Sequence, residues 1–200
     1  ESDDFKVETK GDDSPLTKAD LASHEHIVTG LKKLTPEIPV LSEESQMISY
    51  QERSKWATFW LVDPLDGTKE FIKRNGEFTV NIALIEGSES ILGVVHTPAL
   101  GVTYYAAKGE GAFKEENGNA QSITARHNLA DILEVVASRS HAGAETQALL
   151  EKLARDYTVN LVSKGSALKL CLVAEGAAHF YPRLGPTMEW DTAAAQCVAE

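Results

Sequence analysis

Acidic side chains in three separate segments of the chain could together bind a divalent metal ion. Each segment places them where a predicted strand ends or a predicted helix begins: Glu43 and Glu44 after "PVLS", Asp63 and Asp66 after "FWLV", and Asp191 before "TAAAQ". Carboxylates at such positions are held by rigid elements and stay within reach of solvent, as a site for a hard cation requires. The three segments together predict a metal site.

The sequence "DPLDGT" adds groups that could bind phosphate. Pro64 limits the backbone and Gly67 permits a close approach of the chain, so both aspartates can point into one cavity with an intervening carbonyl group. Gly67 and Thr68, at the start of a predicted helix, present backbone N–H groups to a phosphate oxygen. Carboxylates for metal beside donors for phosphate indicate metal-assisted transfer of a phosphoryl group to water.

Each acidic segment also has a simpler interpretation, which the residues leave open. The stretch "DPLDG" is typical of a turn in which Asp66 caps the following helix. Asp191 suits the N-cap of the alanine-rich run after it, and the pair Glu43 and Glu44 suits a solvated loop. Only the combination of all three segments favours the metal site.

The elements expected around the carboxylates form an α+β pattern in the first part of the chain. A helix with Ser14 or Thr17 as its N-cap is expected to end at Pro36. The run "WATFWLV" predicts a central strand that ends at Asp63, and "IPVLS" predicts a short buried strand. Four further strands within residues 78–115, separated by turns, predict an antiparallel sheet.

The second part of the chain predicts an α/β pattern. Residues 117–132 have the composition of a linker, which places a boundary between a metal-binding α+β subdomain at 1–125 and a substrate-binding α/β subdomain at 126–200. Beyond the linker, strand and helix patterns alternate. Strands are expected at 134–140, 158–167 and 177–183, and helices at 144–156, 168–176 and 191–200.

Composition and charge exclude several classes of protein. The 200 residues are 42% apolar, enough for a large packed domain, and the two cysteines lack the spacing of a disulfide framework or zinc site. A reducing, cytoplasmic location is expected, with peripheral contact at the inner membrane face left open. The longest uncharged stretch contains glycines and a proline, so no transmembrane segment is predicted.

The distribution of charge indicates which partners the chain could take. A net charge of −11 argues against a nucleic acid polymer as partner. Residues 1–137 hold 13 basic and 23 acidic side chains, whereas residues 138–200 hold 6 and 7. An acidic part beside a nearly neutral part suits cations on one side and an anion on the other, although a solvated acidic surface explains the same counts.

Two motifs, "WLVDPLDGTKEF" and "EWDTAAAQ", resemble the signatures of the inositol monophosphatase superfamily, and "SEE" stands twenty residues before Asp63 like that family's third element. Within the superfamily, "SRSH", "GSALKLCLVAEG" and "YPRLGPTMEWDTAA" resemble the 3'(2'),5'-bisphosphate nucleotidases of the CysQ type. The resemblance covers nearly all of the chain. Judged against the family, a first helix before Glu1 and a last strand after Glu200 are expected to be missing.

The resemblance implies a layered αβαβα sandwich, Mg2+ as cofactor, two ions or more, and inhibition by lithium. By motif, one Mg2+ would be held by Glu43, Asp63 and the carbonyl of Leu65, and a second by Asp63, Asp66 and Asp191. A slip of one residue, which would make Glu44 the ligand, is left open. Asp20, Glu43 and Thr68 would be the catalytic residues, with Thr68, hydrogen-bonded to Asp20, helping to orient and deprotonate the attacking water. The amides of Gly67 and Thr68 would receive the phosphate.

Basic residues of the second part are expected to select the substrate. A second phosphate requires Arg or Lys, so the resemblance favours 3'-phosphoadenosine 5'-phosphate, cleaved to AMP and phosphate. An inositol monophosphatase and a non-catalytic cation-binding module are the alternatives, and a homodimer is left open. The residues expected to contact the substrate are Arg139, His141, Lys164, Lys169 and Arg183.

Overall fold

A computed structural model describes residues 8–9, 15–128, 131–138 and 143–200. Its main sheet has seven strands in the order β3-β4-β5-β6-β7-β8-β9, with β3 parallel to β4 and every later pair antiparallel. The antiparallel sheet expected from the turn spacing is therefore confirmed. The strands are β3 (Val40–Ser42), β4 (Thr58–Asp66), β5 (Thr79–Glu86), β6 (Glu89–Thr97), β7 (Val102–Ala107), β8 (Gly111–Glu116) and β9 (Asn119–Ile123).

Strand β9 lies inside the segment that we expected to be a linker. The prediction overlooked the dipeptide Asn117-Gly118, whose φ angles of 53° and 75° belong to a tight two-residue hairpin. This turn pairs β9 with β8 from Glu116 and Asn119 onward. The prediction that this strand ends at Asp63 was also wrong, because β4 continues to Asp66 through a register shift against β5.

The second sheet pairs β10 (Ile132–Ser138) with β11 (Thr158–Lys164) in parallel, connected through α4 (Ala144–Leu153). The strand expected at 177–183 is absent from the described residues, where only one bridge joins Phe180 to Val135. Pairing stops there because Pro182 has no N–H to donate. Before Pro182 the segment is bonded to β10, through the N–H of His179 to the carbonyl of Glu134 and the N–H of Val136 to the carbonyl of Phe180, each at 2.8 Å.

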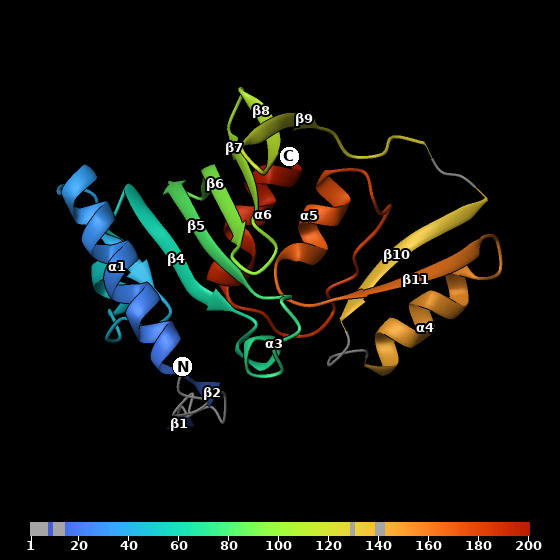
Figure 1. The fold of residues 1–200 in the computed structure, drawn as a ribbon, viewed down its shortest axis with the longest axis horizontal. Helices are drawn as coiled ribbons and strands as arrows, with labels where there is room; N and C mark the ends of the chain where they lie inside the picture. Colours follow the sequence, from blue (N-terminus) through green and yellow to red (C-terminus); the bar gives the residue numbers. More distant parts are fainter. Residues whose placement is uncertain (1–7, 10–14, 129–130, 139–142) are drawn as a thin grey trace.

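Two helices lie between the two sheets, one covers part of the outer face of the main sheet, and one lies outside the second sheet. Helix α1 (Lys18–Leu34) packs on β3 and β4, while α6 (Glu189–Ala199) packs on β5 and β6 and against α5 (Leu168–Ala174). Figure 1 shows the layers in the order α1, main sheet, α5 with α6, second sheet, and α4. The αβαβα sandwich is confirmed. The remaining short elements are β1 (Glu8–Thr9), β2 (Pro15–Leu16), α2 (Tyr50–Arg53) and α3 (Thr68–Ile72).

Helix α6 lies close to the main sheet although it comes last in the sequence. A Cβ added to Gly93 of β6 would stand 2.1 Å from the carbonyl oxygen of Ala194, so only glycine permits this approach. The free thiols Cys171 and Cys197 are buried in the core between α5, α6 and the sheet. The division of the chain at residues 125 and 126 stays a prediction, with α6 resting on strands from before that boundary.

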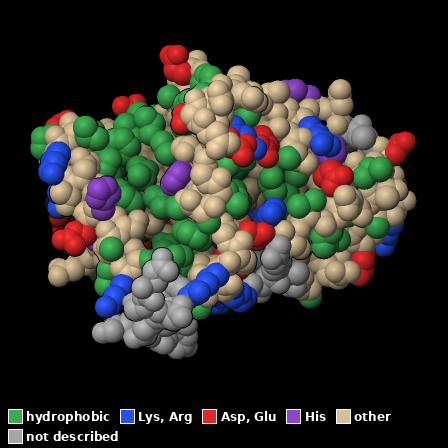
Figure 2. All heavy atoms as spheres, viewed as in Figure 1, with side chains coloured by type: hydrophobic (Ala, Val, Ile, Leu, Met, Phe, Trp, Pro, Cys, Tyr) green, Lys and Arg blue, Asp and Glu red, His purple; other side chains and the backbone are tan. Residues whose placement is uncertain are grey.

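The opposite face of the main sheet is apolar and in part uncovered. In Figure 2, hydrophobic side chains gather over the sheet between α1 and the β8–β9 hairpin. Side chains alternate along a strand, so Leu92 and Val94 point away from α6, and with Tyr105 and Phe113 they line a groove of about 410 Å³.

None of the described helices is long and apolar enough to cross a membrane.

Candidate active site

The three aspartates of the sequence motifs meet where β4 ends and α6 begins. Asp63 and Asp66 lie in the last part of β4, and Asp191 lies in the first turn of α6. One carboxylate oxygen of each lies within 4.8 Å of the others. Asp63 is buried, whereas Asp66 and Asp191 keep partial exposure. The segments separated by more than 120 residues are therefore brought to one point.

The turn at Asp63 forms part of this cluster. Oδ1 of Asp63 accepts a hydrogen bond from the N–H of Leu65 at 3.0 Å, and the Ser23 hydroxyl of α1 donates to the carbonyl of Pro64 at 2.8 Å. These contacts hold the irregular end of β4 from both sides. The stretch "DPLDG" is therefore an irregular strand end that contributes two carboxylates to the cluster.

Asp66 does not cap α3, so the interpretation of Asp66 as the cap of the following helix is wrong. The N-cap is Gly67, at φ 91°, and it has no side-chain cap. Oδ2 of Asp66 instead accepts hydrogen bonds from three donors of other segments, which fix the plane of the carboxylate. They are the N–H of Ala167 at 2.6 Å, and Thr79 Oγ1 and Asn81 Nδ2, each at 3.4 Å.

Asp191 is not the N-cap of α6 but its third residue. Its Oδ2 accepts hydrogen bonds from the Met188 N–H at 3.0 Å and from the Thr187 hydroxyl at 2.7 Å. A carboxylate at this position satisfies a free N–H of the first turn and favours the positive end of the helix. The same contacts hold the side chain in place toward the other two aspartates.

Glu43 adjoins the cluster from the neighbouring strand. Its N–H donates to the carbonyl of Val62 at 3.0 Å, which extends the parallel pairing of β3 with β4. Its charge is among those that act on Asp63. This register supports Glu43 over Glu44 as the glutamate nearer the aspartates, both being half-buried.

The electrostatics of the cluster favour a cation. Burial, together with the charges of Asp66, Glu43 and Asp191, raises the pKa of the Asp63 carboxyl well above its ordinary value. Burial also raises the pKa of Asp66 to about 6, although the Lys169 ammonium lowers it. Carboxylates this close cannot all ionise without a compensating positive charge. An all-oxygen donor set of this kind suits Mg2+ or a similar hard divalent ion.

Asp20 and Thr68 meet beside the cluster. Thr68 Oγ1 donates to Asp20 Oδ1 at 3.2 Å and lies 3.5 Å from the carbonyl oxygen of Leu65. Oδ2 of Asp20 accepts from the N–H of Thr17 at 2.7 Å and from its hydroxyl at 2.5 Å, which closes the capping box of α1. The contact between Asp20 and Thr68 expected from the family is present, while its catalytic role stays a prediction.

Two of the basic residues converge on the same site. Lys169 of α5 is 6% exposed, and its Nζ donates to the carbonyl of Ser166 at 2.5 Å and lies 5.5 Å from the centre of the Tyr181 ring. Burial lowers the pKa of Lys169, against the effect of Asp66, and the charge of Arg183 lowers it further. Arg183 donates from Nη2 to the carbonyl of Pro186 at 2.5 Å, and its Nε has no partner within the described part of the chain.

The other residues expected to contact the substrate are either held in an ion pair or lie outside the described residues. Lys164 is already paired, with its Nζ 3.2 Å from Oε1 of the buried Glu77. Arg139 and His141 lie outside the described residues. Sequence reasoning missed Glu77 and the donors to Asp66. Thr79 and Asn81 could have been found, since they stand at the same alternate positions of β5 as the buried Ala83 and Ile85, where a polar side chain is unexpected.

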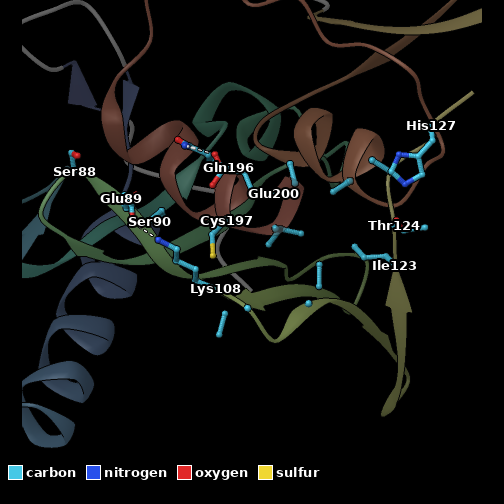
Figure 3. Close-up of a pocket in the computed structure, with 18 residues that line it drawn as sticks. Ser88, Glu89, Ser90, Lys108, Ile123, Thr124, His127, Gln196, Cys197 and Glu200 are labelled. Atoms are coloured by element: carbon cyan, nitrogen blue, oxygen red, sulfur yellow. Dashed lines mark hydrogen bonds and ion pairs between the residues drawn. The ribbon is translucent and has the colours of Figure 1, made fainter. Parts of the chain in front are cut away.

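A cavity of about 690 Å³ lies at the other end of α6 from Asp191. Figure 3 shows Gln196, Cys197 and Glu200 on one side of it and the ion pair of Glu89 with Lys108 on another. Its lining includes none of the residues expected to bind metal or substrate. The cavity is therefore separate from the acidic site.

Comparisons with known proteins identify relatives of the chain. The model of the inositol monophosphatase family matches residues 1–200. The "3'(2'),5'-bisphosphate nucleotidase CysQ" of Salmonella typhimurium is 55% identical over 95% of this chain and 74% of its own length. The protein of the same name from Escherichia coli K12 is 54% identical over 96% of this chain and 76% of its own length.

Solved structures agree with this assignment. The crystal structure of CysQ from Bacteroides thetaiotaomicron superposes with a TM-score of 0.84 at 44% identity, over 98% of this chain and 76% of that one. The inositol monophosphatase of Thermotoga maritima gives a TM-score of 0.76 at 28% identity, over 96% of this chain and 71% of that one. Phosphatases of this family use divalent metal ions. The chain belongs to the inositol monophosphatase family, as the sequence motifs indicated.

Proposed function

We propose that the chain is a Mg2+-dependent 3'(2'),5'-bisphosphate nucleotidase that converts 3'-phosphoadenosine 5'-phosphate to AMP and phosphate. The observation that carries the proposal is the meeting of the carboxylates Asp63, Asp66 and Asp191 with the buried Lys169. The names of the relatives at 54–55% identity support the same substrate class. An acidic metal site beside a buried cation suits a substrate that carries two phosphates.

The ligands proposed for two Mg2+ ions follow the motifs. Glu43, Asp63 and the Leu65 carbonyl would hold one, and Asp63, Asp66 and Asp191 the other, with Asp63 shared between them. When bound, the ions would supply positive charge to the phosphate oxygens and lower the pKa of an adjacent water molecule. The amides of Gly67 and Thr68 are proposed to donate to the phosphate.

Asp20 and Thr68 are proposed to receive the proton of the attacking water. Thr68 Oγ1 donates its hydrogen to Asp20 Oδ1, so its lone pairs can accept a hydrogen bond from water. As water attacks phosphorus, its proton passes to Thr68 Oγ1 and the threonine proton passes to Asp20 Oδ1. The bond from phosphorus to the 3'-oxygen breaks, and that oxygen leaves with AMP and takes a proton from solvent water. Asp20 also accepts two hydrogen bonds from Thr17, which keep it oriented throughout.

Lys169 and Arg183 are proposed to bind the phosphate that is not cleaved. Lys169 sits in a buried position where its charge is costly, and a phosphate dianion would compensate it. Arg183 supplies a fork of donors that suits phosphate oxygens. Lys164 is held by Glu77, so the proposal relies on the other two residues.

The test compares phosphate release from 3'-phosphoadenosine 5'-phosphate and from inositol 1-phosphate, with Mg2+ varied and lithium added to a parallel series. We expect preference for the nucleotide and loss of activity with lithium. Preference for inositol 1-phosphate would favour the alternative of an inositol monophosphatase. The likeness to the Thermotoga maritima structure is the observation behind that alternative. Mg2+ binding without release from either substrate would favour the non-catalytic module.

A cytoplasmic location belongs to the proposal because the two cysteines are free and buried. Peripheral contact with a membrane has no support in the structure and is not proposed. A homodimer stays a prediction, for which sedimentation of the purified chain is the direct test.

A further inference from the structure

The buried carboxylate of Glu77 links the acidic site to the second sheet. Glu77 precedes β5 and is 6% exposed. Its Oε2 accepts a hydrogen bond from the N–H of Gly165 at 3.0 Å, and its Oε1 accepts one from Lys164 Nζ at 3.2 Å. The two partners follow each other at the end of β11, so one carboxylate holds the start of the turn into α5 through both of its oxygens.

The turn from Gly165 to Ala167 has little freedom. A Cβ added at Gly165 would lie 2.7 Å from the carbonyl oxygen of Glu77 and 2.8 Å from Cγ of Glu70. Ser166 adopts the left-handed conformation with φ 48°, which is uncommon for a residue other than glycine. Such a backbone persists only where its surroundings hold it in place. Glu77 provides two of the contacts that do so.

Ala167, at the end of this turn, donates a shorter hydrogen bond to Asp66 than Thr79 or Asn81 does. Its N–H donates to Oδ2 at 2.6 Å, across 101 positions of sequence. The turn also touches the residue after Asp66, since a Cβ at Gly67 would stand 3.3 Å from Cβ of Ser166. The position of the turn therefore decides where the Asp66 carboxylate is held.

We propose that Glu77 is a positioning residue for the metal ligand Asp66. By fixing Lys164 and Gly165, it places the Ala167 N–H on Oδ2 of Asp66 and so turns the carboxylate toward the cation. Groups that hold a metal ligand from behind commonly change metal affinity by 10- to 100-fold when they are removed. The inference about metal affinity rests on Asp66 being a ligand, and its effect on turnover rests on the proposed function.

The test measures Mg2+ binding to the intact chain by titration calorimetry, without substrate. We expect Glu77→Ala to weaken Mg2+ binding about 10-fold or more. Glu77→Gln retains an acceptor for the Gly165 N–H and should lose less. Lys164→Met, which removes one partner and leaves the Gly165 contact, should fall between wild type and Glu77→Ala. The matched control is Glu89→Gln, which breaks the exposed pair with Lys108 and should leave Mg2+ binding unchanged.

Activity separates positioning from loss of folding. With 3'-phosphoadenosine 5'-phosphate, the Glu77 variants should need more Mg2+ for half-maximal turnover, while KM for the nucleotide at saturating Mg2+ stays near the wild-type value. If Glu77→Ala fails to fold by circular dichroism, Glu77→Gln and Lys164→Met decide the question.

The outcomes for this inference and for the proposed function can be told apart. Folded Glu77 variants with wild-type Mg2+ affinity would overturn the positioning role even where the wild type is an active nucleotidase. A wild type that releases no phosphate, but whose Mg2+ affinity falls in Glu77→Ala, would sink the proposed function and leave the positioning role intact.

Discussion

Thr68 Oγ1 of α3 donates a hydrogen bond to Asp20 Oδ1 of α1 at 3.2 Å, so the first turns of two helices meet at one contact beside the carboxylates of β4. Asp20 is also held by the capping box with Thr17. Thr68 Oγ1 also lies 3.5 Å from the carbonyl oxygen of Leu65, and its backbone begins α3 directly after Gly67. A hydroxyl that is oriented in this way can accept from a water molecule in a defined direction.

Removing the proton acceptor should slow the chemical step. We expect Asp20→Asn to lower kcat about 100- to 10,000-fold, the usual contribution of a general base, with Mg2+ affinity nearly unchanged. The capping box loses charge as well, which should reduce the free energy of unfolding by about 1 kcal/mol. Kinetics at saturating Mg2+ and urea unfolding measure the two effects separately. Thr68→Ser, which keeps the hydroxyl, is the control, and a kcat near wild type in Asp20→Asn would contradict the proton path.

Asp66→Asn should abolish phosphate release with little loss of folding. The asparagine keeps an oxygen for the N–H of Ala167 but removes a negative charge from a crowded cluster. Without metal, the variant should be as stable as the wild type or more so, because repulsion with Asp191 is relieved. Thermal unfolding in chelator and calorimetry with Mg2+ check this. Wild-type turnover in this variant would remove Asp66 from the metal site.

The raised pKa of Asp66 predicts how the free energy of unfolding without metal depends on pH. Burial raises the pKa of Asp66 from 3.8 to about 6 in the folded chain, so the folded state binds this proton more tightly than the unfolded state. The contribution to stability is therefore present below pH 3.8 and is lost as pH rises through about 6. Mg2+ needs the ionised carboxylates, so the stabilisation by added Mg2+ should grow over the same interval.

Melting curves at pH 5, 6, 7 and 8, each with chelator and with Mg2+, measure this dependence. Asp66→Asn should make the metal-free curve less dependent on pH, with the raised pKa of Asp63 supplying the dependence that remains, and should remove most of the gain from Mg2+. A Mg2+ gain that is as large at pH 5 as at pH 8 would show that Asp66 does not titrate in this interval.

The carboxylates could be predicted from sequence because short motifs place them at element ends. Their surroundings could not, because the partners come from distant segments. Ala167 lies 101 residues from Asp66, and Glu77 reaches Gly165 across 88. No local pattern marks an alanine as a donor or a glutamate before a strand as buried. The fold was predicted well wherever periodicity decided it, and poorly at Asn117-Gly118 and Pro182, where turn chemistry and a missing N–H decided it.

Gly93→Ala should destabilise the chain because the added methyl meets the Ala194 carbonyl of α6 at 2.1 Å. Backbone cannot rotate away as a side chain can, so we expect a loss of about 1–3 kcal/mol in the free energy of unfolding, or more. Gly30→Ala in α1 is the matched control, since its Cβ would have no neighbour within 4 Å. That change should stabilise by about 0.4–1 kcal/mol. Urea unfolding of both variants measures these free energies, and equal values for Gly93→Ala and Gly30→Ala would disprove the tight contact.

Arg183→Ala should separate the two substrate classes. If the guanidinium binds the second phosphate, its loss should cost about 2–4 kcal/mol in kcat/KM for 3'-phosphoadenosine 5'-phosphate and far less for inositol 1-phosphate. Lys169→Met should follow the same pattern, although its Nζ also lies near Asp66, so its effect on Mg2+ affinity must be measured alongside. Lys108→Met removes an exposed cation far from the acidic site and serves as control. Equal losses on both substrates in Arg183→Ala would mean that Arg183 supports the loop at Pro186 and does not select the nucleotide.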